Sequence, residues 1–287
     1  MSNKDLLGNI KKLREMTGVG FKDCKTALDE TKGDIEKSIE YLRKKGIAKA
    51  SKKMSRTASE GLALAKEDKG DISLIEINSE TDFVAKNEDF INFCKELSEI
   101  NFNMKSDLTK LNESKMANGV LVKDNLVNLI AKIGEKITIR RAEYFDKSNG
   151  TNFFYVHSAI EKGIGKIISV VKLDGAFKEN EDIGTKIAMH IAALNPLAID
   201  KDGIDKKLVD KELEIIKAEI TNSGKPAEMA EKISKGKISK FLNDNSLLNQ
   251  IWIMDPKKKV SDVLKEKSTE QPLKVLNFVR YKVGEGI

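Results

Sequence analysis

The chain has 287 residues, 40% of them hydrophobic and 33% charged, so it can bury a core and is long enough for about two globular units. Its 4 prolines and 19 glycines exclude a collagen-like chain or a proline-rich linker, and its 2 cysteines, without a C-x-x-C pair, exclude a disulfide scaffold and a zinc site of the usual spacing. Residues 1–57 carry a net charge of +7, from 15 Lys/Arg against 8 Asp/Glu, and residues 58–287 carry −1, which together give the net charge of +6. Because the bulk of the chain is balanced, direct nucleic-acid binding is unlikely.

The N-terminus has charges within its first five residues and no apolar segment behind them, which is unlike a secretory signal. No apolar run approaches the ~18–20 residues needed to span a bilayer. We therefore expect a cytoplasmic protein without a membrane segment.

Residues 1–46 predict a domain of three short helices. Apolar residues recur at helical spacing, Thr17–Gly20 breaks the first helix, and Gly33 ends the second. Asp34 caps the third helix, which we expect to end at Gly46. So small a unit suits a docking module better than a catalytic domain, and residues 47–58 predict a basic linker.

Residues 59–287 predict two copies of one arrangement of strands and helices. The first copy is a core N-subdomain (59–145) and the second is a core C-subdomain (146–287). Each copy has a strand hairpin, helix and a closing strand with arginine at its middle. The expected fold class is α+β, with a small antiparallel sheet and helices on one face in each half. The expected strands are 60–66, 71–78, 136–145, 152–159, 166–173 and 273–287. The expected helices include 122–133, ended by Gly134, one through Phe90, Cys94 and Leu97, and one through Ile183, Ile187 and Ile191.

A helical insertion at about 183–243 interrupts the second copy. Val209, Leu213, Ile216 and Ile220 have the spacing of the seam in an antiparallel helix pair. Gly224–Pro226 would connect the first helix to a return helix at 226–242. We expect this coiled-coil hairpin to project from the body and to be free to contact a partner.

Catalytic, cofactor-binding and metal-binding motifs are missing from the sequence, so we expect no enzyme activity, cofactor or metal. Only His157 and His190 could serve as histidine acid–base groups, and His190 lies in an apolar helix where a packed histidine is the usual case. Cys24 and Cys94 lie on apolar helix faces typical of core positions. A small-molecule enzyme using a histidine and direct RNA binding remain as rival functions.

The segment EINSETDFVAKNEDF, residues 76–90, joins a buried strand to a helix. In one interpretation Phe83 staples the start of that helix to the core. In the other, Phe83 projects beside Asp82 as an aromatic anchor for a partner.

Several segments resemble the translation elongation factor Ts family, in order and over nearly the whole chain. They are TGVGFKDCKTAL (17–28), GDIEKSIEYLRKKG (33–46), TDFVAKN (81–87), AKIGEKITIRR (131–141), IAMHIAALNP (187–196) and FVRYKVGEGI (278–287). The resemblance implies a guanine-nucleotide exchange factor for elongation factor Tu, acting on the GDP-bound and nucleotide-free forms. It also implies a ubiquitin-associated-like fold for the three-helix domain.

The resemblance further implies which residues act. Thr81, Asp82, Phe83 and Val84 match the family stretch that displaces Mg²⁺ from Tu, with Phe83 as the wedge and Asp82 holding it. His157 matches a residue that faces another domain of Tu. The three-helix domain would dock on the GTPase domain, with partner contacts at Arg14, Gly18, Val19 and Gly20.

Two further expectations come from the resemblance. The insertion mediates self-association in some members, which leaves a homodimer open for this chain. Some members continue beyond the GEGI motif with a helical module that touches Tu, whereas this sequence ends at Ile287. We expect either a smaller interface or compensation by other surfaces.

Overall fold

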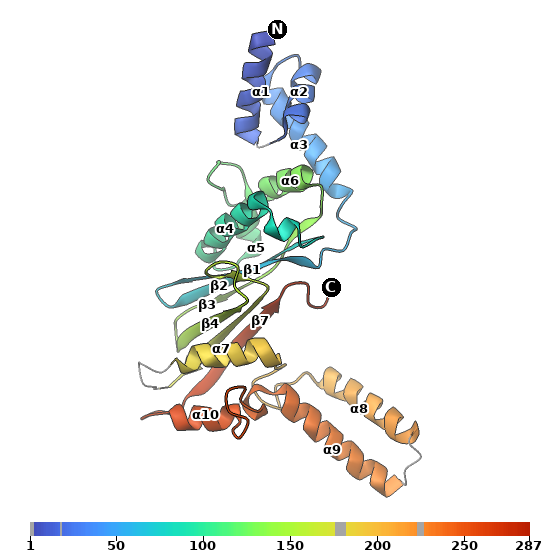
Figure 1. Ribbon diagram of the computed structural model, residues 1–287, viewed down its shortest axis with the longest axis vertical. Coiled ribbons are helices and arrows are strands. Elements are labelled where there is room, and N and C mark those ends of the chain that lie inside the picture. The colour runs from blue at the N-terminus through green and yellow to red at the C-terminus, as the bar shows by residue number, and fades with distance from the viewer. Residues whose placement is uncertain (1–2, 18, 176–181, 223–226) are drawn as a thin grey trace. The chain divides into compact units, whose positions relative to one another are not determined.

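A computed structural model describes residues 3–17, 19–175, 182–222 and 227–287 (Figure 1). The predicted α+β class with helices at the N-terminus and two small antiparallel sheets is confirmed. The chain divides into two compact units. The first comprises Met1–Phe145, Ser158–Ile167 and Tyr281–Ile287, and the second comprises Asp146–His157 and Ile168–Arg280.

The first unit begins with three helices, α1 (Asn3–Thr17), α2 (Phe21–Glu30) and α3 (Ile35–Ser51). Asp34 caps α3 as predicted, because its carboxylate accepts a hydrogen bond of 3.0 Å from the backbone N–H of Lys37. The apolar stripes of the three helices meet in one small core. Its buried members are Ile10, Leu13, Cys24, Ala27, Leu28 and Leu42.

The predicted end of the third helix at Gly46 is wrong, because α3 continues to Ser51. Gly46 is buried where α3 meets α6 (Val122–Ile133), and a methyl group added to it would lie 3.4 Å from Cγ1 of Val127. Arg43 adds an ion pair of 3.0 Å to Asp124 across the same contact. The missing side chain thus permits close helix packing rather than a helix end.

The first sheet has the strand order β3-β2-β1-β5. Strands β1 (Glu60–Asp68) and β2 (Asp71–Ser79) form the predicted hairpin, in register from Glu60↔Ser79 to Asp68↔Asp71. Lys69 and Gly70 both have positive φ, as the tight turn of a two-residue hairpin requires. The predicted closing strand is β3 (Ile137–Phe145), and a short strand that was not predicted, β5 (Ile164–Gly165), pairs with β1.

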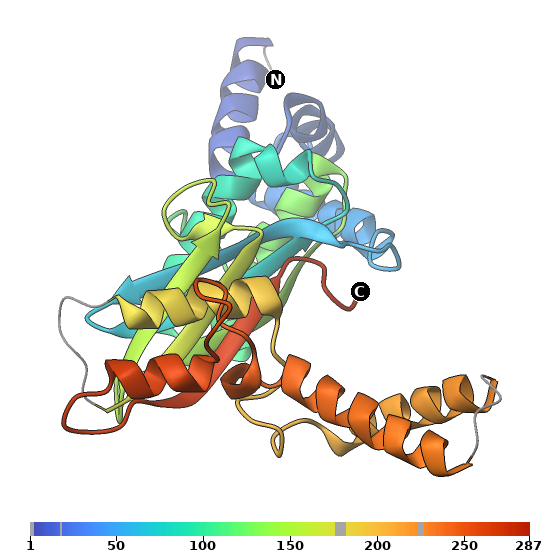
Figure 2. The same ribbon diagram turned by 60° about the horizontal axis from the view of Figure 1, so that its bottom comes forward.

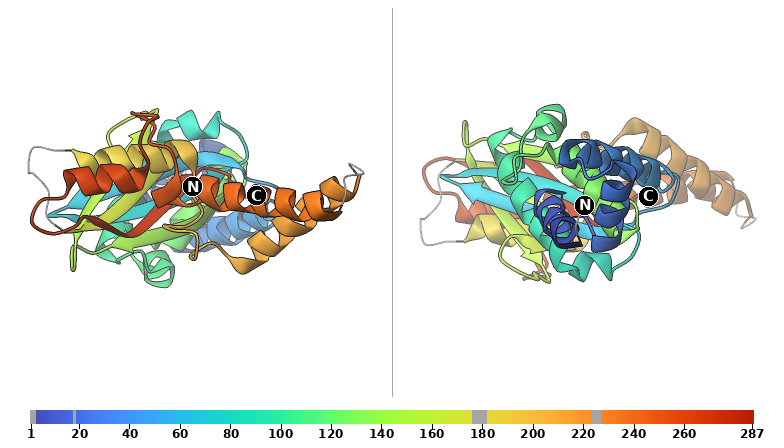
Figure 3. Two further views of the ribbon diagram at one scale, coloured as in Figure 1. Left: turned by 90° about the horizontal axis from the view of Figure 1, so that it is seen from below. Right: turned by 90° about the horizontal axis from the view of Figure 1, so that it is seen from above.

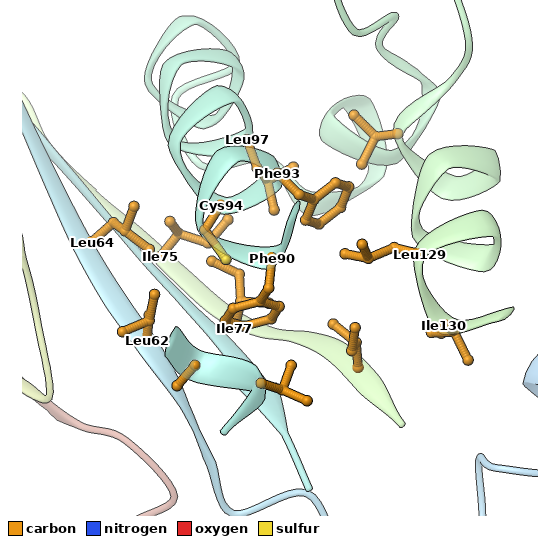
Figure 4. Packing of buried hydrophobic residues seen from close by; sticks show 14 of the residues in the cluster. Leu62, Leu64, Ile75, Ile77, Phe90, Phe93, Cys94, Leu97, Leu129 and Ile130 are labelled. Atoms are coloured by element: carbon orange, nitrogen blue, oxygen red, sulfur yellow. The ribbon is translucent and has the colours of Figure 1, made fainter. Parts of the chain in front are cut away.

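Helices α4 (Glu88–Asn103) and α6 pack on the first sheet around its main core. Figure 4 shows Phe90, Cys94 and Leu97 of α4 above the apolar side chains of β1 and β2, with Phe93 toward α6. Gly134 ends α6 in the left-handed conformation, as predicted. The 3₁₀ turn η1 (Val84–Lys86) precedes α4, and the short α5 (Leu108–Glu113) was not predicted.

The second unit contains a sheet of order β4-β6-β7, made of β4 (Thr151–His157), β6 (Ile167–Asp174) and β7 (Lys274–Lys282). Helices α7 (Ile183–Leu194) and α10 (Val260–Lys267) pack against it, as Figure 2 shows. Asn195 ends α7 in the left-handed conformation, just before Pro196. The 3₁₀ turn η2 (Leu247–Asn249) and α10 were not predicted.

Two long helices, α8 (Lys206–Asn222) and α9 (Ala227–Asn245), lie side by side in the second unit (Figure 3). Ile216 and Ile220 of the predicted seam are buried, and Lys237 of α9 forms an ion pair with Glu219 of α8. The predicted connection at Gly224–Pro226 lies outside the described residues. Of the span predicted as a helical insertion, α7 packs with the sheet, while α8 and α9 form the helix pair.

Candidate functional site

The loop between β2 and α4, residues 80–87, places an aromatic ring in solvent. The side chain of Phe83 is 78% exposed, whereas its neighbours Val84 and Ala85 are only 6% and 2% exposed and belong to the main core. The interpretation of Phe83 as a staple on the core is therefore wrong. Val84 takes the core position, and the ring of Phe83 points away from it.

Glu135 holds the beginning of this loop with both carboxylate oxygens. One oxygen accepts a hydrogen bond of 3.0 Å from the backbone N–H of Thr81, and the other accepts one of 2.8 Å from the Thr81 hydroxyl. The hydroxyl of Ser79 donates to the carbonyl of Thr81 at 3.0 Å. Hydrogen bonds to a charged acceptor are stronger than neutral ones, so Thr81 is fixed at the end of β2.

The other end of the loop is fixed by the core and by a helix cap. Phe83 has helical backbone angles, and its carbonyl accepts a hydrogen bond of 3.1 Å from the N–H of Lys86. Asn87 caps α4 by accepting from the N–H groups of Asp89 and Phe90. Anchors on both sides therefore hold the backbone of Phe83 in one conformation while its ring stays in water.

The exposed ring lies beside a pair of opposite charges. Asp82 and Lys86 form an ion pair of 2.7 Å, and the Lys86 ammonium lies 6.0 Å from the centre of the Phe83 ring. The hydrogen bond from Lys86 lowers the pKa of the Asp82 carboxyl, with a smaller opposing effect of burial. Asp82 is therefore charged at neutral pH, next to a hydrophobic group.

Glu80 connects the loop to two other segments. It accepts a hydrogen bond of 2.6 Å from the backbone N–H of Lys136 and forms an ion pair of 3.2 Å with Arg56. Burial raises the pKa of Glu80, but the Lys136 N–H and the charges of Arg56 and Lys53 outweigh it and lower the pKa. Glu80 and Glu135 thus join the loop to the turn after α6.

Two of the predicted partner contacts lie in the three-helix region, where Arg14 and Val19 line one open groove with Leu7 and Phe21. Leu7 and Phe21 are 58% and 47% exposed. Gly20 is the exposed residue before α2, and Gly18 lies outside the described residues. Lys11 and Glu15 also line the groove, which therefore combines apolar side chains with two cations and one carboxylate.

His157 lies at the exposed end of β4 in the second unit, whereas the loop 80–87 belongs to the first. Its Nδ1 atom is 3.2 Å from the hydroxyl of Tyr155. The structure thus places an exposed histidine at a strand end.

The other side chains considered for catalysis, His190, Cys24 and Cys94, are buried in the core. His190 is fully buried, with Nε2 3.0 Å from Oε1 of Gln250 and its ring stacked on Trp252, and burial lowers its pKa. The expectation of a packed histidine is confirmed, as are the buried positions of Cys24 and Cys94. Within the described ranges, no group of three or more His, Cys, Asp or Glu side chains is placed to hold a metal ion, and no helix is both long and apolar enough to cross a bilayer.

Sequence reasoning missed one buried carboxylate in the first sheet. Glu76 is completely buried and forms ion pairs with Arg140 (2.9 Å) and Arg141 (2.6 Å) of β3. It also accepts a hydrogen bond of 2.9 Å from the backbone N–H of Gly284, near the C-terminus. Sequence reasoning also missed the role of Glu135, although Glu135 lies within the segment AKIGEKITIRR that carries the family resemblance.

Comparison with known proteins identifies relatives over almost the whole chain. The family model described as "Elongation factor TS" matches residues 80–285. Elongation factor Ts of Zymomonas mobilis is 41% identical over 282 residues, covering 97% of this chain and 92% of that protein. The proteins of the same name from Xanthobacter autotrophicus and Clostridium kluyveri are 42% and 43% identical, covering 98% and 97% of this chain and 92% of each relative.

Proposed function

This chain belongs to the elongation factor Ts family, and from that membership we propose that it binds elongation factor Tu and releases GDP by displacing Mg²⁺ with the loop 80–87. The general exchange role in translation elongation follows from the family. An exchange factor speeds the dissociation of a nucleotide without changing the overall equilibrium between GDP and GTP, and it makes or breaks no covalent bond, so the proposed function is not that of an enzyme. Work with Tu would take place in the cytoplasm.

The exposed ring of Phe83 on a backbone held at both ends is the observation that carries the proposal. Large aromatic side chains supply much of the binding energy at protein interfaces. A side chain whose backbone is held before binding loses less conformational freedom when it binds. Phe83 is therefore suited to enter a pocket of a partner.

Mg²⁺ joins the nucleotide phosphates to protein oxygens in a GTPase and carries much of the local positive charge. In the proposed complex Phe83 occupies space that the closed, Mg²⁺-holding site needs, and Asp82 helps to orient it. Loss of the ion leaves the phosphate charges poorly screened, so GDP dissociates. Binding of this chain and of GDP then weaken one another through one reciprocal coupling free energy.

Other surfaces would complete the interface with Tu. The groove with Arg14 and Val19, together with Gly18 and Gly20, would dock on the GTPase domain, and the exposed His157 would face another domain of Tu. The α8–α9 pair is the proposed site of any self-association. These assignments come from the family resemblance, and exposure of the described residues supports them.

The test is stopped-flow release of labelled GDP from purified Tu at fixed Mg²⁺, with and without this protein. Phe83→Ala should slow the stimulated release at least tenfold, since truncating such an anchor costs about 2 kcal/mol or more. Phe83→Leu should retain part of the activity. Ile251→Ala, which truncates another exposed apolar side chain, serves as the control and should leave release unchanged. Unchanged release with Phe83→Ala would contradict the proposed mechanism.

A further inference from the structure

A basic pocket lies where α3 ends, and no part of the proposed mechanism uses it. Its cationic lining residues are Lys49, Lys52, Lys53 and Arg56. Ile130, Ala131 and Gly134 at the end of α6 also line it. The pocket therefore combines positive charges with apolar groups.

The positive charges of this pocket exceed the carboxylates that pair with them. Lys49 shares Asp23 with Lys45, at 3.1 Å from each ammonium, and Arg56 pairs with Glu80. Among the residues that the structure describes, Lys52 and Lys53 form no ion pair with a carboxylate, and Lys53 acts on Glu80 only through its field. Two carboxylates thus face four cations, so the pocket carries a net positive charge.

Helix stability explains only part of this arrangement. Cations near a helix C-terminus interact favourably with its dipole, which accounts for Lys49 in the last turn of α3 and Lys52 at its cap. Lys53 and Arg56 follow the helix and lie in the same pocket, where like charges repel. An anionic ligand would relieve that repulsion.

An ion pair and hydrogen bonds connect the lining of the pocket to the loop that carries Phe83. Arg56 pairs with Glu80, the residue before Thr81, and its carbonyl accepts a hydrogen bond of 2.8 Å from the Lys136 ammonium. Gly134 in the pocket wall directly precedes Glu135, which holds Thr81. A partner seated on Phe83 therefore also comes within reach of the pocket.

We propose that this basic pocket receives an acidic segment of the same GTPase that the loop 80–87 engages, an inference that rests on the proposed function. Residues 58–287 have nearly equal numbers of acidic and basic groups, so the broad basic face that a phosphodiester backbone requires does not extend beyond the pocket region. Complementary charge on two proteins mainly raises the rate at which they associate, and it has less effect on the steps that follow binding. The pocket accordingly speeds encounter, and Phe83 acts on GDP release.

The test compares Lys52→Ala/Lys53→Ala with Lys257→Ala/Lys274→Ala, which removes two exposed cations from the second unit. Association of each full-length variant with GDP-bound Tu is followed by stopped-flow fluorescence at low and high ionic strength. The pocket variant should associate roughly tenfold more slowly at low salt and approach the wild type at high salt, since salt screens steering. GDP release at saturating exchange factor should be unchanged.

Equal association rates for both lysine pairs would overturn the inference. So would normal association with Tu combined with loss of binding to a labelled RNA oligonucleotide, which would assign the pocket to nucleic acid. Slow association of the pocket variant together with normal GDP release by Phe83→Ala would support the pocket and contradict the Mg²⁺-displacement mechanism. The two proposals therefore fail separately.

Discussion

The carboxylate of Glu76 on β2 lies 2.9 Å from the backbone nitrogen of Gly284, a residue 208 positions later in the chain. The same carboxylate pairs with Arg140 and Arg141, and Arg140 in turn donates to the carbonyl of Glu285. Tyr281 completes this cluster, with the Arg141 guanidinium 4.1 Å from its ring centre. One buried charge therefore attaches the C-terminal segment 281–287 to the first sheet.

Replacing Glu76 should destabilise the fold strongly. Glu76→Gln leaves two partly buried guanidinium groups without their anion, and breaking a buried pair in this way costs about 3 kcal/mol or more. Chemical denaturation should show that loss in the free energy of unfolding. Gly284→Ala should have a similar effect, because φ is +77° there and an added methyl group would lie 1.9 Å from the Ser59 carbonyl oxygen. Stabilities of both variants equal to the wild type would contradict this account of the cluster.

The contribution of Glu76 should depend on pH in a defined direction. Burial raises the pKa of Glu76, but hydrogen bonds from Gly284, Arg141, Asn78 and Arg140 outweigh it, so the pKa in the folded state lies below 4.5. Fewer protons are then bound in the folded state, and the stabilisation is present above the pKa of the unfolded state and lost as pH falls through the folded value. The stability difference between wild type and Glu76→Gln should be constant above about pH 5 and shrink below it. If the stability difference between wild type and Glu76→Gln instead grew as the pH falls, the pKa of Glu76 would be raised in the folded state, not lowered.

Phe83 and Val84 should separate function from stability although they are adjacent. Val84→Ala removes buried methyl groups and should cost about 2 kcal/mol of unfolding free energy. Phe83→Ala changes an exposed side chain and should alter stability by less than about 0.5 kcal/mol. Thermal unfolding of the two variants beside GDP release provides the comparison. A large loss of Tm in Phe83→Ala would place the ring in the fold instead of at an interface.

Glu135 should affect exchange only through the loop that it holds. Glu135→Ala removes both hydrogen bonds to Thr81, so Phe83 loses part of its fixed geometry and GDP release slows. Combining it with Phe83→Ala should add little to the effect of Phe83→Ala alone, since both act on one element. The double-mutant cycle on the GDP release rate measures this. Fully additive effects would show that Glu135 acts independently of Phe83.

Local patterns predicted most of the longer elements of this fold but not the contacts between distant segments. Alternation and the Lys69–Gly70 turn were enough for the β1–β2 hairpin, and Gly134 was enough for the end of α6. Gly46 gave the same local signal as Gly134, and only the packing of α3 on α6 distinguishes them. The loop that carries Phe83 is also held by a distant residue, Glu135, whose role no local pattern reveals.

Burial excludes one of the two interpretations of the segment 76–90, the staple on the core, and the role of Phe83 as an anchor stays a prediction. A staple and an anchor share the same sequence pattern, an aromatic residue beside a β-branched one at a helix start. The main core takes Val84 and Ala85 and leaves no place for Phe83. The partner-binding roles assigned to Arg14, Gly18, Val19, Gly20 and His157 stay predictions.

The unbroken course of α3 has a mechanical consequence. Its first half supplies Leu42 to the core of the three-helix region, and its second half supplies Ala50 to the main core below α6. The 17 residues of α3 form one helix about 25 Å long, so a single continuous helix connects the two cores. A protein that binds and displaces the N-terminal helices would therefore also move the sheet next to Phe83, because α3 transmits the displacement as a continuous helix.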